Sequence, residues 1–169
     1  MIKISDIIVA TPVLPARFVS ADYDRFLFFD FSLRGEFSIF DEIQRVAERG
    51  SRILVFYAHS LELLGLSGNG ESWSGKMAEI DGTLSKRDEP YGLIVTDLNA
   101  SWVMAQHSPV ELGVFAFKST SPCSLMILNS LSGEDFLAVE DFRSAAIDEG
   151  SRLNEHFDGE FIESIINNY

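Results

Sequence analysis

A glycine- and serine-rich segment, residues 68–75, reads Gly-Asn-Gly-Glu-Ser-Trp-Ser-Gly and begins two patterns that carry chemistry. A nucleophile elbow needs Gly-x-Ser-x-Gly so that a strained turn exposes the hydroxyl, but Ser74 stands at the fifth position. A dinucleotide-binding loop needs Gly-x-Gly-x-x-Gly, but Trp73 replaces the third glycine. Since neither pattern is complete, the segment predicts a surface loop. Trp73, flanked by small residues, is then a candidate contact for a partner.

Three histidines are the other side chains suited to acid–base or metal chemistry: His59, His107 and His156. They lie far apart in the sequence, and no His-Glu-x-x-His pattern occurs. His59 ends an apolar segment and could border a cleft, with Asp22, Asp24 or Asp30 supplying a carboxylate. This combination is one hypothesis for an enzyme, a small hydrolase or transferase. It predicts a deep pocket with converging polar groups.

Cys123 is the only cysteine in the chain, which excludes a disulfide framework and a cysteine-rich zinc site. No apolar run approaches the roughly 20 residues that span a bilayer. The first residues lack the long apolar stretch of a signal peptide, because Asp6 interrupts it. We therefore expect a soluble, cytoplasmic protein with no metal site and no cofactor.

The spacing of apolar residues predicts one domain, residues 1–169, with an α+β fold. Apolar runs predict strands at residues 2–10, 25–32, 52–59, 77–84, 91–98, 102–107 and 112–118, with 125–128 as a further candidate and 61–75 as a loop. Helical spacing predicts helices at residues 38–49, within 136–147, and at 159–168. Short turns make neighbouring strands antiparallel. We expect a mainly antiparallel sheet of about six strands, with one inner helix and C-terminal helices packed on it.

The charge of the chain is strongly negative and unevenly distributed. The chain has 26 acidic and 13 basic residues, a net charge of −13, and residues 119–169 hold 10 of the acids but only 2 of the bases. These acids alternate with apolar residues, so they should line exposed faces of helices. They either form a solubilising surface or bind a basic partner, since charge complementarity speeds association. The candidate partner-binding residues are Glu134, Asp135, Glu140, Asp141, Asp148, Glu149 and Trp73.

In its size, acidity and composition over the whole chain, the sequence resembles the immunity proteins of bacterial polymorphic and contact-dependent toxin systems. The resemblance implies an inhibitor that binds a cognate toxin, such as a basic nuclease or deaminase, and occludes its active site or substrate-binding surface. An acidic protein should not bind nucleic acid or an anionic membrane directly. Besides the enzyme hypothesis, a nucleic-acid mimic is a second alternative, which predicts acids spaced like phosphates along an elongated surface.

Overall fold

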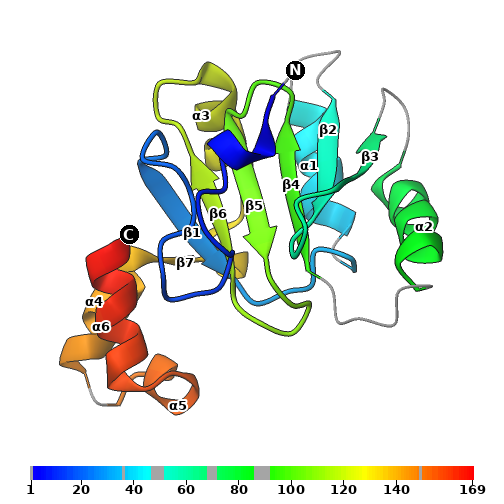
Figure 1. Ribbon diagram of the computed structural model, residues 1–169. Helices are drawn as coiled ribbons and strands as arrows, with labels where there is room; N and C mark the ends of the chain where they lie inside the picture. The colour runs from blue at the N-terminus through cyan, green and yellow to red at the C-terminus, as the bar shows by residue number, and fades with distance from the viewer. Residues whose placement is uncertain (1, 36, 47–51, 68–71, 86–91, 149) are drawn as a thin grey trace.

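The computed structural model describes residues 2–35, 37–46, 52–67, 72–85, 92–148 and 150–169. Its centre is a seven-stranded sheet with the order β3-β2-β4-β5-β6-β1-β7, in which every neighbouring pair is antiparallel. The strands are β1 Arg25–Phe29, β2 Ile53–Tyr57, β3 Leu63–Ser67, β4 Leu93–Asp97, β5 Trp102–Gln106, β6 Gly113–Phe117 and β7 Leu137–Ala138. The helices are η1 Ile4–Asp6, α1 Phe37–Val46, α2 Trp73–Leu84, α3 Pro122–Ser130, η2 Gly133–Asp135, α4 Val139–Ile147, α5 Leu153–His156 and α6 Gly159–Asn168. Figure 1 shows the arrangement.

The central strands are apolar on both faces because both faces of the sheet are covered. All five residues are buried in each of β2, β4, β5 and β6. Side chains alternate across a strand, so Leu54 and Phe56 point into one core while Ile53 and Val55 point into the other. An antiparallel sheet exposed to water on one side would instead show polar residues at every second position.

The first core lies under α1, α2 and α3. Its large side chains include Phe40 and Ile43 of α1, Trp73 and Met77 of α2, and Ile127 of α3. Ser72 begins α2 by accepting a hydrogen bond from the Gly75 backbone N–H at 3.2 Å, a typical helix N-cap. Burial of these helix faces closes one side of the sheet.

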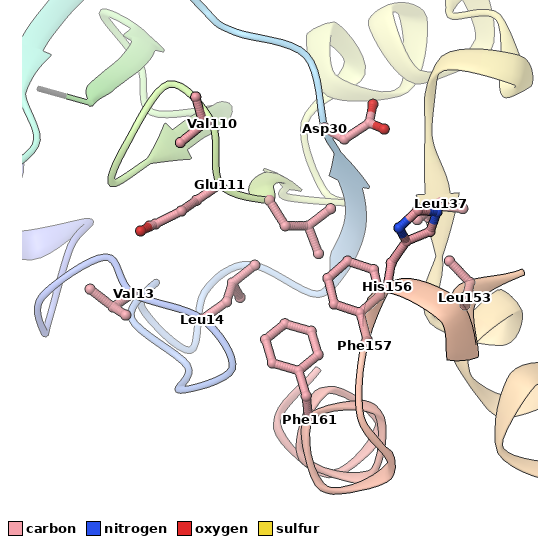
Figure 2. Close-up of a pocket in the computed structure, with 11 residues that line it drawn as sticks. Val13, Leu14, Asp30, Val110, Glu111, Leu137, Leu153, His156, Phe157 and Phe161 are labelled. Atoms are coloured by element: carbon pink, nitrogen blue, oxygen red, sulfur yellow. The ribbon is translucent and has the colours of Figure 1, made fainter. Parts of the chain in front are cut away.

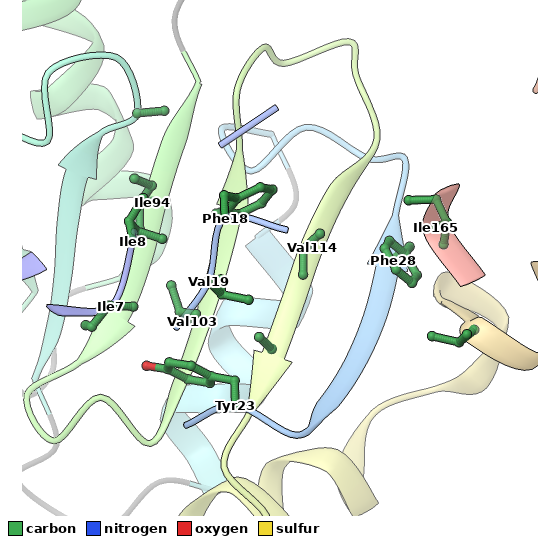
Figure 3. Packing of buried hydrophobic residues seen from close by; sticks show 14 of the residues in the cluster. Ile7, Ile8, Phe18, Val19, Tyr23, Phe28, Ile94, Val103, Val114 and Ile165 are labelled. Atoms are coloured by element: carbon green, nitrogen blue, oxygen red, sulfur yellow. The ribbon is translucent and has the colours of Figure 1, made fainter. Parts of the chain in front are cut away.

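The second core is closed by two segments from opposite ends of the sequence. The N-terminal segment lays Ile7, Ile8, Phe18, Val19 and Tyr23 across the middle of the sheet, where Figure 3 shows them over the central strands. Helices α4 and α6 cover the side near β1 with residues such as Phe142 and Ile165. The two covers are joined, because the Tyr169 hydroxyl donates to the Ala16 carbonyl at 2.9 Å.

The α+β class is confirmed, and the sheet has seven strands where the sequence predicted about six. The predicted last helix agrees with α6, and Asp158 caps it by accepting from the Phe161 backbone N–H at 2.7 Å. The predicted inner helix, residues 38–49, agrees with α1 up to Val46, and its residues 47–49 lie outside the described part. It is joined on the same face by α2 and α3, which the sequence did not predict as helices.

Four local predictions are wrong. Residues 2–10 form η1 and one isolated bridge, Ile8 to Val19, because Ile7 and Ile8 are both buried and do not alternate. Residues 77–84 belong to helix α2, and residues 125–128 belong to α3, whose start is fixed by Ser121 and Pro122. The predicted loop 61–75 contains the edge strand β3 and the start of α2, and its residues 68–71 lie outside the described part.

None of the helices in the described ranges combines the length and the hydropathy that crossing a lipid bilayer requires.

Candidate functional site

The acidic candidates lie in what we call the C-terminal lobe, residues 133–169, which comprises η2, α4, α5 and α6 beside the β7 edge of the sheet (Figure 1). Five candidates are exposed there: Glu134, Asp135, Glu140, Asp141 and Asp148. Glu149, the sixth acidic candidate, lies outside the described residues. Helices α5 and α6 add three further exposed acids to the lobe, Glu155, Glu160 and Glu163.

Three of the candidate acids also have a local structural role. Asp141 accepts a hydrogen bond from the Ala138 backbone N–H at 2.6 Å, which stabilises the start of α4. Glu140 forms an ion pair with Arg143 at 2.9 Å. Asp148 accepts from the Gly150 backbone N–H at 3.0 Å, in the turn after α4. Glu134 and Asp135 lack such side-chain partners in the described structure and are therefore open to an external cation.

The prediction that Trp73 is exposed in a loop is wrong. Trp73 is the first residue of α2 and has no exposed surface. Its ring stacks on Phe40 with the centroids 3.8 Å apart, and its indole N–H donates to the Leu33 carbonyl at 3.4 Å. A side chain held in this way does not reach a partner. The spacing of Trp73, Met77, Ile80 and Leu84 is helical and was the signal in the sequence for this core position.

Two of the histidines meet at one end of the sheet, beyond the C-terminal ends of two inner strands. His59 follows β2 and His107 follows β5, and their rings stack with centroids 4.2 Å apart. Gly92, before β4, lies between these two strands. A Cβ added to Gly92 would lie 1.8 Å from the Gln106 carbonyl oxygen, so only glycine fits the close approach of the backbone.

The environment of His107 disfavours its charged form. Burial lowers the pKa of His107, the neighbouring His59 lowers it further, and Glu111 opposes the shift. The Nδ1 atom of His107 is buried with no hydrogen-bond partner in the described structure. Two histidines alone are a poor metal site, and no group of three or more described histidine, cysteine, aspartate or glutamate residues is arranged to hold an ion.

The carboxylates of the enzyme hypothesis do not gather around His59. Asp30 follows β1, and β1 is four strands away from β2, so about 19 Å separates the two positions at roughly 4.8 Å per strand. Asp24 lies at the opposite end of β1, where it accepts from the Ser119 backbone N–H at 2.8 Å. The hydrogen bond from the Ser119 hydroxyl lowers the pKa of Asp24, and this backbone bond lowers it further. Asp22 lies 3.8 Å from the Lys118 ammonium at that same end.

An apolar groove of about 470 Å³ lies at the same end of the strands as His107, next to Asp30, which follows β1 (Figure 2). Its volume is in the range typical of ligand sites. The lining residues come from five separate segments: Val13, Leu14, Asp30, Val110, Glu111, Leu112, Leu137, Leu153, His156, Phe157 and Phe161. The rings of Phe157 and Phe161 stack at 4.9 Å and form much of its floor.

The polar groups of this groove lie around its rim. Figure 2 shows the carboxylates of Asp30 and Glu111 turned away from the two phenylalanine rings. Neither carboxylate forms a hydrogen bond or ion pair with another described side chain. The ring of His156 forms none either within the described residues. Acid–base catalysis needs such groups to converge on one point. The arrangement is better suited to binding an apolar group next to a positive charge.

The sequence did not predict this groove, because no single segment carries it. One local signal was present, a valine at position 110 in a short polar turn. Comparison of the chain with protein-family models, with curated proteins and with solved structures finds no match.

Proposed function

We propose that this chain is a protein-binding inhibitor of the immunity or antitoxin type. It would occlude the active site or substrate-binding surface of a basic toxin, such as a nuclease or deaminase. The observation that carries the proposal is the C-terminal lobe, whose exposed acids are left almost unneutralised. Within residues 119–169 of the described structure, the only ion pair joins Glu140 and Arg143. These residues have a net charge of −8, from 10 acids and 2 bases.

The mechanism is occlusion by a charged surface held in place by a folded lobe. A toxin that acts on nucleic acid presents lysines and arginines to phosphates, and carboxylates can occupy those same positions. Glu140 and Asp141 of α4, and Glu160 and Glu163 of α6, lie on helices whose inner faces bury Phe142, Ile162 and Ile165, so the backbone that carries these charges is fixed by the core. Such preorganisation lowers the entropy lost on binding. No bond in the partner needs to be broken.

The first experiment is capture with a tagged chain at low salt from the native host, followed by purification of the captured protein. The expected partner is basic, binds in a fixed ratio, and loses its enzymatic activity as the complex forms. Absence of inhibition by a stoichiometric amount of this chain contradicts the proposal, even if a complex forms.

Charge reversal then tests the surface. The double variant Glu134→Lys/Asp135→Lys should slow association by about tenfold and reduce its dependence on salt. The control is Asp41→Lys/Asp6→Lys, which makes the same change of charge on exposed residues of α1 and η1. Equal association rates for the two variants would show that net charge, and not the C-terminal lobe, controls binding.

A further inference from the structure

We propose that the groove of Figure 2 receives a segment of the basic partner in which a bulky apolar side chain stands next to a lysine or arginine. This inference rests on the proposed function and assigns a contact surface within it. The acids of the C-terminal lobe account for charged contacts with the partner, and the groove adds an apolar contact.

The apolar surface continues from the floor of the groove to its rim. Phe157 and Phe161 are half-buried on the floor, whereas Val110 is 90% exposed and Val13 is 40% exposed. A single exposed valine needs no explanation, but exposed apolar side chains that border an apolar cavity are typical of binding sites. A partner side chain that entered the groove would remove Val110 and both phenylalanines from water together.

The rim is held rigidly from inside the protein. The buried Gln106 side chain donates to the Glu111 carbonyl at 2.7 Å and to the Phe31 carbonyl at 2.9 Å. The first bond fixes the turn that carries Val110, and the second fixes the segment that carries Asp30. Gln106 also accepts from the Leu33 backbone N–H at 3.2 Å. Both sides of the groove are therefore positioned before a partner arrives, which favours binding.

The charge of the rim selects the occupant. Asp30 and Glu111 are exposed, and within the described structure neither carboxylate forms a hydrogen bond or an ion pair, although Glu111 interacts electrostatically with His107. A second copy of this chain would bring another net charge of −13 to an acidic rim, which opposes self-association. Asp30 and Glu111 border the groove from different segments, so lysines or arginines that flank the apolar side chain complement this rim. Such a segment agrees with the basic partner inferred from the C-terminal lobe.

The test uses three blocked heptapeptides, titrated into the isotope-labelled chain and followed by NMR chemical shifts. The first alternates lysine with leucine and phenylalanine, the second has glutamate in place of lysine, and the third has alanine in place of the apolar residues. Only the first should shift the amides of Val110, Leu112 and Phe161. If none of the peptides shifts them, or if the glutamate peptide binds as well, the inference is wrong.

Matched variants assign the binding to the groove. Val110→Ser should weaken the first peptide about tenfold, because it removes an apolar contact. Ile147→Ser is the control, since Ile147 is 87% exposed on α4 and does not line the groove. Asp30→Asn/Glu111→Gln should weaken binding and reduce its salt dependence, whereas Asp41→Asn should not. Equal effects of Val110→Ser and Ile147→Ser would overturn the assignment.

A small-molecule site is the competing outcome, and octanol is its probe. Octanol that shifts the groove amides more strongly than the first peptide does would overturn the inference. The two proposals also fail separately. A captured toxin that is inhibited equally by the wild type and by Val110→Ser leaves the proposed function intact and removes the groove from it. Selective peptide binding without any inhibited partner leaves the groove as a peptide-binding site and contradicts the proposed function.

Discussion

The rings of His59 and His107 stack at a centroid distance of 4.2 Å with their planes inclined by 28°, and the His59 Nε2 atom lies 3.3 Å from the His107 carbonyl oxygen. Protonation of His107 places a charge on a partly buried ring, against a second histidine. Burial and His59 both lower the pKa of His107. Both effects favour the neutral form of His107 in the folded state.

Acidification should destabilise the protein through His107. The pKa of His107 is lower in the folded state than in the unfolded chain, where it is about 6.5. Between these two values the unfolded state binds more protons, so the free energy of unfolding falls as the pH falls through this window. Above the unfolded-state pKa the histidine is neutral in both states and the loss disappears. Urea unfolding of wild type and His107→Gln, at several pH values between 5 and 8, should show a smaller slope for the variant.

The control for this prediction is His156→Gln, which changes an exposed histidine of α5. Both variants remove one histidine and retain every carboxylate, so a difference between their slopes reports on the environment of His107. If His107→Gln and His156→Gln lose the same slope, the effect does not come from the stacked pair.

Two glycine substitutions should change the stability in opposite directions. An alanine at Gly92 would place its Cβ 1.8 Å from the Gln106 carbonyl oxygen and 2.3 Å from the His107 carbonyl carbon. The start of β4 and the end of β5 would therefore have to move apart. An alanine at Gly82, inside α2, meets nothing within 4 Å. Gly82→Ala should therefore raise the free energy of unfolding by about 0.5–1 kcal/mol. Gly92→Ala should lower it, and chemical denaturation measures both.

Asp141 should matter more for stability than Glu134, an exposed acid without such a hydrogen bond. Its carboxylate accepts the Ala138 backbone N–H, which has no helical partner at the start of α4. Asp141→Ala should lower the free energy of unfolding by about 1 kcal/mol, as loss of a helix cap does. Glu134→Ala should change it by less than about 0.5 kcal/mol. Equal effects would mean that this hydrogen bond contributes nothing measurable.

Removal of the Trp73 ring should be costly. Trp73→Ala leaves a cavity against Phe40 and should lower the free energy of unfolding by about 3–5 kcal/mol. Ile147→Ala, on an 87% exposed side chain, should have an effect of less than about 0.5 kcal/mol. If thermal melting of Trp73→Ala resembles that of the wild type, the indole is not part of the core.

The sequence predicted correctly those elements whose signals all lie within one short segment. The continuous apolar run of β2 requires cover on both faces, and α6 has both its cap, Asp158, and its apolar stripe within a few residues. Prediction failed at α2, where the preceding glycines and serines favoured a loop and Trp73 was taken as exposed. The helical spacing from Trp73 to Leu84 was a weaker signal than those neighbours.

The candidate sites depend on strand order, which local patterns do not encode. His59 and His107 are 48 residues apart and meet because β4 alone separates β2 from β5. The groove needs the N-terminal segment, the β5–β6 turn and the α5–α6 region to meet at one end of the sheet. The acidic surface was predictable because it follows from the count of charges in residues 119–169.

Both tryptophans, Trp73 and Trp102, belong to the core under α1, α2 and α3, and each is at most 1% exposed. Neither lines the groove. Intrinsic fluorescence is therefore a reporter for one layer of the molecule. Its emission should be blue-shifted in the native state and should move to the red only when that helical layer opens. Occupation of the groove should leave the spectrum unchanged, so a red shift during a titration would signal unfolding and not binding.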